Sequence, residues 1–242
     1  MTKKENIEEF YDQFSELQQQ TGVNLRHYQL INELISAGMK PAHTVLEVGC
    51  GIGTLTGLIA AYVKKGRIVA ADISSKSVEI AQKRLAGKTN VTFEVTDMKG
   101  FVYTEPFDFI VLPDVMEHIP VDQHPDLFKT LVKNMHQRSL IFIHIPHPLA
   151  LDYYREHQPE SLQIIDQSLD AEQLVKDASR AGLQLVKYTA YSLFHREHDY
   201  VMLHFTLRSA VELHPLSKSH VIRKKLNLRI QWFFKTVISE II

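Results

Sequence analysis

The sequence is poor in cysteine, in long apolar runs and in any excess of charge of one sign. Its single cysteine, Cys50, excludes a disulfide within the chain. No apolar run reaches the roughly 20 residues of a membrane-spanning helix, and the first residues, MTKKENIEEF, lack the apolar core of a signal peptide. These absences predict a cytoplasmic protein.

The charge is nearly balanced, with 27 lysines and arginines against 28 aspartates and glutamates. A formal net charge of -1 provides no basic field, so we expect no nucleic-acid partner. Hydrophobic residues make up 45% and charged residues 23% of the chain, as in an ordinary globular protein. At 242 residues the chain fits one sizeable domain with appendages.

Three glycines, Gly49, Gly51 and Gly53, stand at alternate positions early in the chain. The β-branched and apolar run 44–48 before them predicts a buried strand, and residues 54–63 after them predict a helix. A strand, a glycine turn and a helix form the start of a βαβ unit. The glycines allow a ligand to approach the backbone closely, and the unpaired N–H groups of the helix point into the turn.

Two acidic residues accompany this turn. Glu47 lies inside the strand before it, where a carboxylate suits a cation better than a pyrophosphate. The third glycine also comes one place too early for the dinucleotide pattern G-x-G-x-x-G. Asp72 ends the next predicted strand, 67–72, about 20 residues beyond the turn, where a carboxylate can accept both hydroxyls of a ribose.

The string L-E-V-G-C-G-I-G, residues 46–53, resembles motif I of the class I S-adenosylmethionine (SAM) methyltransferases. The resemblance implies an α/β fold, a Rossmann-like three-layer sandwich around a seven-stranded sheet of order 3-2-1-4-5-7-6. That sheet is mainly parallel, with the last strand antiparallel. The resemblance also implies SAM as the cofactor, with the amino-acid end of this sulfonium held by the glycine turn. Periodicity alone predicts only a mainly parallel α/β sheet.

The same resemblance assigns roles to residues after the third predicted strand, 91–95. In the family an acid there takes the adenine amino group and its neighbour packs on the ring, roles that fall to Asp97 and Met98. The alternative for Asp97 is a turn or cap residue. The cofactor-binding residues implied by the resemblance are Glu47, Gly49, Cys50, Gly51, Gly53, Asp72, Ile73, Asp97, Met98, Leu112 and Asp114.

A second motif, Asp114-x-x-Glu117-His118, follows the fourth predicted strand, 107–112. If a helix starts here, the two carboxylates and the imidazole share one face and form a credible site for a divalent cation such as Mg²⁺. The spacing resembles the metal-binding E-x-x-E-H signature of ubiquinone-type O-methyltransferases and small-RNA 2′-O-methyltransferases, with Asp for the first Glu. Metal-free relatives use the final Glu-His for capping and packing, so both roles stay open.

Methyl transfer to a hydroxyl requires a base, and the chain has 13 histidines. His147 is the first candidate for the catalytic base, because it follows the fifth predicted strand, 140–145, at the carboxyl edge of the sheet. His118 is the second candidate, and His195 lies in a loop before the last strand. For each of them the alternative is a capping or surface imidazole.

These features predict a SAM-dependent methyltransferase similar to the ubiquinone-type small-molecule O-methyltransferases. We expect the acceptor to be a small molecule or a lipid- or sugar-linked metabolite, methylated at oxygen in preference to nitrogen or carbon. The alternatives are an RNA or protein methyltransferase and a SAM-binding partner module without catalysis. The last alternative conflicts with the intact set of predicted cofactor residues.

The predicted core spans residues 41–208. In residues 1–40, Phe10, Phe14 and Leu17 share one face of a predicted helix. The family resemblance implies that this segment is a helical lid over the cofactor, and the alternative is a plain packing helix. Residues 149–169 show no clear periodicity and are predicted to form a long functional loop. The family resemblance implies that this insertion shapes the acceptor site.

Residues 209–242 are predicted to form a basic amphipathic helical tail. Leu226, Ile230 and Phe233 belong to an apolar seam, and acids are nearly absent from this segment. Such a helix can dock on its own protein, pair with a second copy in a homodimer, or lie on an anionic membrane. The predicted location is therefore cytoplasmic, with peripheral membrane contact as an alternative.

Overall fold

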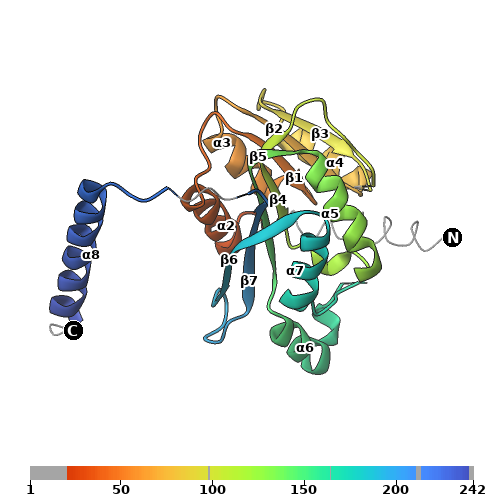
Figure 1. Cartoon of the computed structure of the whole chain (residues 1–242). Coiled ribbons are helices and arrows are strands. Elements are labelled where there is room, and N and C mark those ends of the chain that lie inside the picture. Colours follow the sequence, from red (N-terminus) through yellow and green to blue (C-terminus); the bar gives the residue numbers. More distant parts are fainter. Residues whose placement is uncertain (1–20, 98, 164, 211–213, 240–242) are drawn as a thin grey trace. The chain divides into compact units, whose positions relative to one another are not determined.

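The computed structural model describes residues 21–97, 99–163, 165–210 and 214–239 (Figure 1). The helix predicted around Phe10 and Phe14 and the adenine contact predicted for Met98 lie outside the described residues. The chain divides into two compact units, residues 1–208 and 209–242, which are described separately below.

The first unit is built on one seven-stranded sheet with the order β3-β2-β1-β4-β5-β7-β6. All neighbouring strands pair in parallel except those that involve β7, which is antiparallel to both β5 and β6. This arrangement confirms the predicted class I methyltransferase fold. The strands are β1 (Thr44–Val48), β2 (Arg67–Asp72), β3 (Val91–Val95), β4 (Phe107–Pro113), β5 (Met135–Pro146), β6 (Leu183–Tyr191) and β7 (Tyr200–Leu207).

Helices cover both faces of this sheet, and each central strand is therefore apolar on both sides. In β1 the side chain of Val45 packs with α2 and α3, whereas that of Leu46 packs with α5 and α7 on the other face. Both side chains are fully buried, as expected for consecutive residues of a strand enclosed between two layers.

The helices of the first unit follow the strands in a regular βα succession (Figure 1). Most of them begin or end at sequence signals such as the Asn24 cap of α2 and the Ser74 cap of α4. They are α2 (Leu25–Ser36), α3 (Thr54–Tyr62), α4 (Ser75–Arg84), α5 (His124–Lys133), α6 (Pro148–His157) and α7 (Ala171–Arg180), with short 3₁₀ turns η1 (Met116–His118), η2 (Val121–Gln123) and η3 (Pro159–Ser161).

The predicted loop 149–169 is wrong in its first half, which is the helix α6. The helix starts at Pro148, and only Leu151 on it is buried, so no apolar stripe marks it in the sequence. Strand β5 also begins earlier than predicted, because Met135 pairs with Phe107 before the continuous apolar run starts.

The carboxyl ends of the parallel strands meet at one edge of the sheet, and the antiparallel β7 begins at this same edge. Pro113 pairs with His144, and Pro146 pairs with Tyr200. The glycine turn after β1, Asp72 and the residues that follow β4 therefore meet where open α/β sheets bind their ligands.

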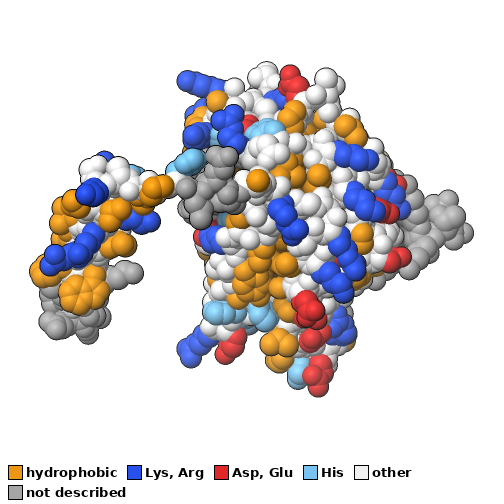
Figure 2. Space-filling view, viewed as in Figure 1, with side chains coloured by type: hydrophobic (Ala, Val, Ile, Leu, Met, Phe, Trp, Pro, Cys, Tyr) orange, Lys and Arg blue, Asp and Glu red, His pale blue; other side chains and the backbone are white. Residues whose placement is uncertain are grey.

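The second unit contains helix α8 (Lys218–Ser239). Its apolar and basic side chains lie next to one another over the visible surface (Figure 2). Among the described residues no helix is long and apolar enough to cross a membrane. The exposed apolar side chains of α8 belong to Val221, Ile222, Leu226, Leu228, Ile230, Trp232, Phe233 and Phe234.

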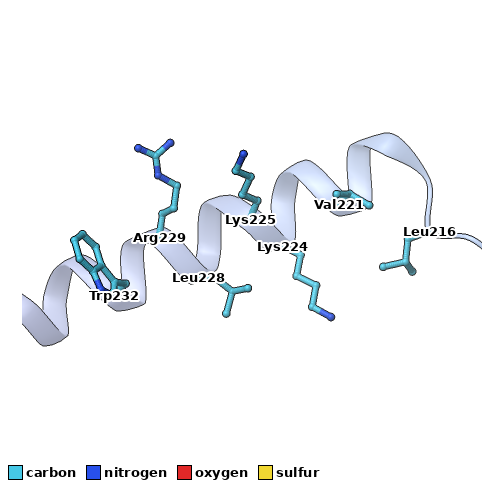
Figure 3. Close-up of a pocket in the computed structure, with 7 residues that line it drawn as sticks. All are labelled: Leu216, Val221, Lys224, Lys225, Leu228, Arg229 and Trp232. Carbon is cyan, nitrogen blue, oxygen red and sulfur yellow. The ribbon is translucent and has the colours of Figure 1, made fainter.

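Apolar side chains of α8 also lie outside the seam predicted from the sequence. Leu226 and Ile230 follow one line along the helix, whereas Leu228 and Trp232 line a shallow hollow on a different side. In Figure 3 Lys225 and Arg229 point away from Lys224 across the helix axis. The basic residues are thus distributed around the helix between two apolar stripes.

Candidate cofactor and acceptor site

A cavity of about 320 Å³ opens at the carboxyl edge of the sheet. Its lining comes from α2, from the ends of β1, β2 and β4, and from the loops after β3 and α6. The residues around it that carry polar side chains are Thr21, Asn24, Arg26, His27, Glu47, Cys50, Thr54, Asp72, Ser77, Asp97, Asp114, His118 and Gln163.

The glycine turn forms one wall of this cavity and needs glycine for two reasons. Gly49 and Gly51 have φ angles of 76° and 50°, in the left-handed region that other residues rarely adopt. A Cβ atom on Gly49 would also lie 2.2 Å from Cγ2 of Val115. The turn is held by Ala71, whose carbonyl accepts the N–H groups of Gly49 and Cys50 at 2.8 and 3.0 Å.

Glu47 is fully buried at the base of the turn and lines the cavity. Neither of its carboxylate oxygens has a hydrogen-bond partner among the described residues. Burial raises the pKa of Glu47 to about 8, because the charged form has lost its water. A buried carboxylate without donors fits a cationic ligand group, and the ammonium of an amino acid has both the charge and the donors.

Asp72 lies at the end of β2 and also faces the cavity. Its carboxylate accepts the N–H groups of Gly51 at 2.7 Å and Ser74 at 2.9 Å, which orient it beside the turn. Ile73 and Asp97 line the cavity next to it. This side of the cavity, below β2 and β3, can hold a ribose and a base.

Residues 45–137 match the family described as "Methyltransferase domain". These residues form a methyltransferase domain. The glycine turn, Glu47, Asp72 and Asp114 all lie within it. Outside the domain, the chain supplies the cavity with Arg26 and its neighbours on α2 and with Gln163.

Among curated proteins, the methyltransferase domain resembles Nodulation protein S of Sinorhizobium fredii, 29% identical over 94 residues, 39% of this chain and 42% of that protein. It also resembles a malonyl-[acyl-carrier protein] O-methyltransferase of Priestia megaterium, 30% identical over 101 residues, 42% of this chain and 35% of that protein. The match thus spans less than half the length of either relative.

Among solved structures, the fold is similar to magnesium protoporphyrin IX methyltransferase of Synechocystis with bound S-adenosylhomocysteine (SAH). The TM-score is 0.61 at 20% identity, over 75% of this chain and 82% of that one. The N-methyltransferase NodS of Bradyrhizobium japonicum gives a TM-score of 0.59 at 20% identity, over 76% and 95% of the two chains. At these identities the likeness concerns the fold alone.

Most residues predicted to contact the cofactor line the cavity, but two do not. Leu112 is fully buried and does not line the cavity. It lies in the core between the sheet and α5. Gly53 is the N-cap of α3, and a Cβ atom on it would meet Ala81 of α4 and the following Leu85. The predicted residues that do line the cavity are Glu47, Gly49, Cys50, Gly51, Asp72, Ile73, Asp97 and Asp114.

Asp114 has a left-handed backbone with a φ angle of 56°, the only such residue other than glycine in the described chain. Its carboxylate bonds the guanidinium of Arg26 at 2.9 Å and Nδ1 of His144 at 2.6 Å. Burial alone would raise the pKa of Asp114, but these two neighbours hold it well below its usual range. The Arg26 cation therefore stands where the predicted metal would have to bind.

The predicted metal ligands are not gathered into one site. Whereas Asp114 pairs with Arg26, the Nδ1 of His118 donates to the carbonyl of Ile165 at 2.6 Å. Glu117 is buried, and its carboxylate lies 3.9 Å from Nε2 of His118. In the described parts of the chain no group of three histidine, cysteine or acidic side chains could hold a metal ion.

His118 lines the cavity and is surrounded by carboxylates. Besides Glu117, Asp166 lies 3.2 Å from its Nδ1. Burial lowers the pKa of the imidazole, but Glu117, Asp166 and the Ile165 carbonyl outweigh it and raise the pKa to about 9. Burial in turn raises the pKa of Glu117 to about 8, so the two groups titrate as a pair.

His147, the first candidate for the base, does not line the cavity. It is the N-cap of α6, and its Nδ1 accepts the N–H of Leu149 at 3.3 Å. His147 thus caps a helix, as in the alternative given for it above. This follows from its position directly before Pro148, the first residue of α6.

The lid predicted for residues 1–40 named none of the α2 side chains that line the cavity. Arg26, His27 and Asn24 lie in the first turn of α2 and line the cavity together. The sequence marks only the start of this helix, where Asn24 as N-cap precedes an apolar pattern. Nothing in the sequence links Arg26 to Asp114.

Proposed function

We propose that this protein is a SAM-dependent methyltransferase. The observation that carries the proposal is a single cavity with two carboxylates beside the glycine turn. One, Glu47, is buried without a hydrogen-bond donor, and the other, Asp72, follows the turn by about 20 residues. Glu47 suits the ammonium of the cofactor and Asp72 its ribose. Support comes from the similar structures, several of which contain SAM or SAH.

For the acceptor we propose a small molecule or a carrier-, lipid- or sugar-linked metabolite, methylated at oxygen. The names of the relatives favour small or carrier-bound substrates. An RNA acceptor is the second candidate, because a ribosomal RNA small subunit methyltransferase A of Natranaerobius thermophilus is 27% identical over 56% of this chain. The net charge of -1 disfavours RNA.

The test begins with SAH binding, measured by calorimetry, and continues with transfer from methyl-labelled SAM to a cell extract. Label that survives nuclease and protease digestion of the products and stays in the small-molecule fraction supports the proposal. Label lost with nuclease or with protease supports the alternatives. SAH binding without any transfer supports a partner module that only binds the cofactor.

A divalent cation would have to displace Arg26 from Asp114 to use the predicted ligands. We therefore propose a reaction that does not need the cation, and expect activity to persist in excess chelator. Activity that is lost in chelator and restored by Mg²⁺ would return Asp114, Glu117 and His118 to the role of ligands.

A further inference from the structure

The cavity has two sides, and only one is accounted for by the cofactor. Asp72 after β2 and Asp97 after β3 assign the nucleoside to the side of β2 and β3. Strand β4 lies on the opposite side of β1, so the methyl group faces the wall formed by α2, the end of β4 and η1. This acceptor wall contains Arg26, His27 and His118.

Arg26 brings a donor without a partner to the acceptor wall. Its terminal nitrogen bonds Asp114 at 2.9 Å. Its Nε atom is buried and has no hydrogen-bond partner among the described residues. A buried guanidinium N–H that lacks an acceptor is costly, and an anionic ligand in the cavity would satisfy it.

His27 also presents a donor rather than a base. Its Nδ1 accepts the backbone N–H of Asn24 at 3.2 Å, which fixes the proton of the neutral ring on Nε2. Burial and the nearby Arg26 lower the pKa of His27 to about 4, so the ring is neutral and a weak proton acceptor.

His118 cannot readily accept a proton either. Its Nδ1 donates to the carbonyl of Ile165 at 2.6 Å and lies 3.2 Å from Asp166, and these acceptors raise the pKa of the ring. Asp114, the remaining acid on this wall, is already engaged by Arg26 and His144. The N–H donors of Arg26, His27 and His118 thus dominate the described part of the acceptor wall, and its carboxylate, Asp114, is already engaged.

We infer that the methyl acceptor of this protein is a carboxylate, held by Arg26 and His118, and that the product is a methyl ester. This inference rests on the proposed methyltransferase function and names its substrate class. A carboxylate oxygen attacks the methyl carbon, the carbon–sulfur bond breaks, and its electron pair stays on sulfur to give SAH. No proton moves, so the step requires positioning but no base.

The same wall disfavours the other acceptors. An alcohol needs a base to remove its proton, and an amine arrives at neutral pH as an ammonium that must first lose one. An ammonium would also meet the N–H donors of Arg26 and His118 where it needs acceptors. A carboxylate supplies the acceptor that the unsatisfied Nε of Arg26 lacks.

The experiment uses full-length protein, methyl-labelled SAM and two sources of acceptor: deproteinised yeast extract, and a mixture of malonate, succinate, benzoate and octanoate. Methyl esters release volatile methanol in mild alkali, whereas methyl ethers and N-methyl groups do not. We expect most of the transferred label to become volatile. Alkali-stable label would overturn the inference and leave the proposed function standing. No transfer to either source, with SAH binding intact, would count against both.

Variants then test the two residues. His118→Gln and Arg26→Gln should each lower ester formation about tenfold or more at limiting acceptor, with SAH affinity unchanged. His157→Gln and Arg138→Gln, both at exposed positions, are the matched controls. Unchanged ester formation in His118→Gln would overturn the assignment of the acceptor wall, even if Arg26→Gln failed to fold.

Discussion

Glu47 is a residue whose protonation should report on the cofactor. With a pKa of about 8 it is mostly protonated at pH 7 in the free protein, because burial disfavours its charge. The ammonium of SAH, placed beside it, stabilises the carboxylate and lowers that pKa. Binding at pH 7 should therefore release a proton.

Calorimetry of SAH binding in buffers of different ionisation enthalpy measures this release. The sign follows from the raised pKa: affinity should increase as pH rises from about 7 toward 8, because less free energy is then spent on deprotonation. The Glu47→Gln variant is the control and should show no release. Equal enthalpies in all buffers for the native protein would mean that Glu47 does not meet the ammonium.

Asp72 carries the second residue-scale prediction. Charge-assisted hydrogen bonds to ribose hydroxyls contribute about 1.5–3 kcal/mol each, so Asp72→Ala should weaken SAM binding more than tenfold. The substitution also removes the acceptor for Gly51 and Ser74. Asp72→Asn keeps one acceptor for that turn, and thermal unfolding of both variants separates loss of the ribose contact from loss of the turn. Native affinity in a folded Asp72→Ala protein would contradict the assignment.

The positions of single site residues were predictable where the local geometry of the chain fixes them. Glu47 and Asp72 belong to a strand–turn–helix unit whose geometry is local, so sequence position alone fixes which way they face. Arg26 and Asp114 are 88 positions apart, and their ion pair depends on how α2 packs on the sheet. For His147 the base role stays a prediction: the strand end places the residue at the edge of the sheet, but its side chain caps α6 and does not line the cavity.

At the scale of elements, the strand β1, its glycine turn and helix α3 act as one unit with the loop after β4. The Cβ of a Gly49→Ala variant would overlap Val115 and strain a φ angle of 76°. We expect this variant to lose about 1–3 kcal/mol of unfolding free energy and most of its SAH affinity. Denaturant unfolding and calorimetry measure the two effects.

The double variant Gly49→Ala with Val115→Ala separates the causes. Removing the Val115 methyl groups relieves the overlap but leaves the backbone strain, so stability should return only in part. Full recovery would assign the whole effect to the overlap, and no recovery would assign it to the backbone.

Helix α6 provides a prediction about His147. As an N-cap it contributes to helix stability, so His147→Ala should cost about 0.5–2 kcal/mol of unfolding free energy and leave the turnover number unchanged. Thermal unfolding and steady-state kinetics check both parts. A fall in turnover by roughly 10²–10⁴ without loss of stability would restore His147 as the base.

Strand order was predictable from the family resemblance, and strand positions were predictable from apolar runs. Helix α6 was not, because it buries only Leu151 and leaves Leu149 and Tyr153 exposed, so no apolar stripe marks its inner face. The start of β5 was missed because its edge residues alternate less clearly than the apolar centre. Weak burial removes the periodic signal on which such predictions depend.

On the scale of the whole molecule, α8 is the part that the methyltransferase fold does not require. Among its described residues, eight large apolar side chains are exposed, which is unfavourable in water, and two stripes cannot both be covered by one flat surface. We expect the intact protein to self-associate or to float with anionic vesicles, and a chain ending at residue 208 to do neither. Both should bind SAH equally, since the cavity lies within residues 21–163.

Light scattering and vesicle flotation measure these outcomes, with neutral vesicles as the control for charge. Flotation only with anionic vesicles would make peripheral membrane contact the role of the tail. A monomeric intact protein that ignores vesicles, combined with poor solubility of the shortened chain, would mean that the tail covers its own subunit.

The contact between Arg26 and Asp114 joins α2 to the loop after β4, two segments that lie on either side of the cofactor residues in the sequence. The residues assigned to SAM run from Glu47 to Asp97 without interruption, whereas the acceptor wall is assembled from α2 on one side of that stretch and residues 113–163 on the other. Donor chemistry and substrate choice are therefore separable along the gene. A chimera that keeps residues 41–97 and takes its flanks from another methyltransferase should inherit the flanking protein's substrate, provided that α2 and the loop after β4 are exchanged as a pair.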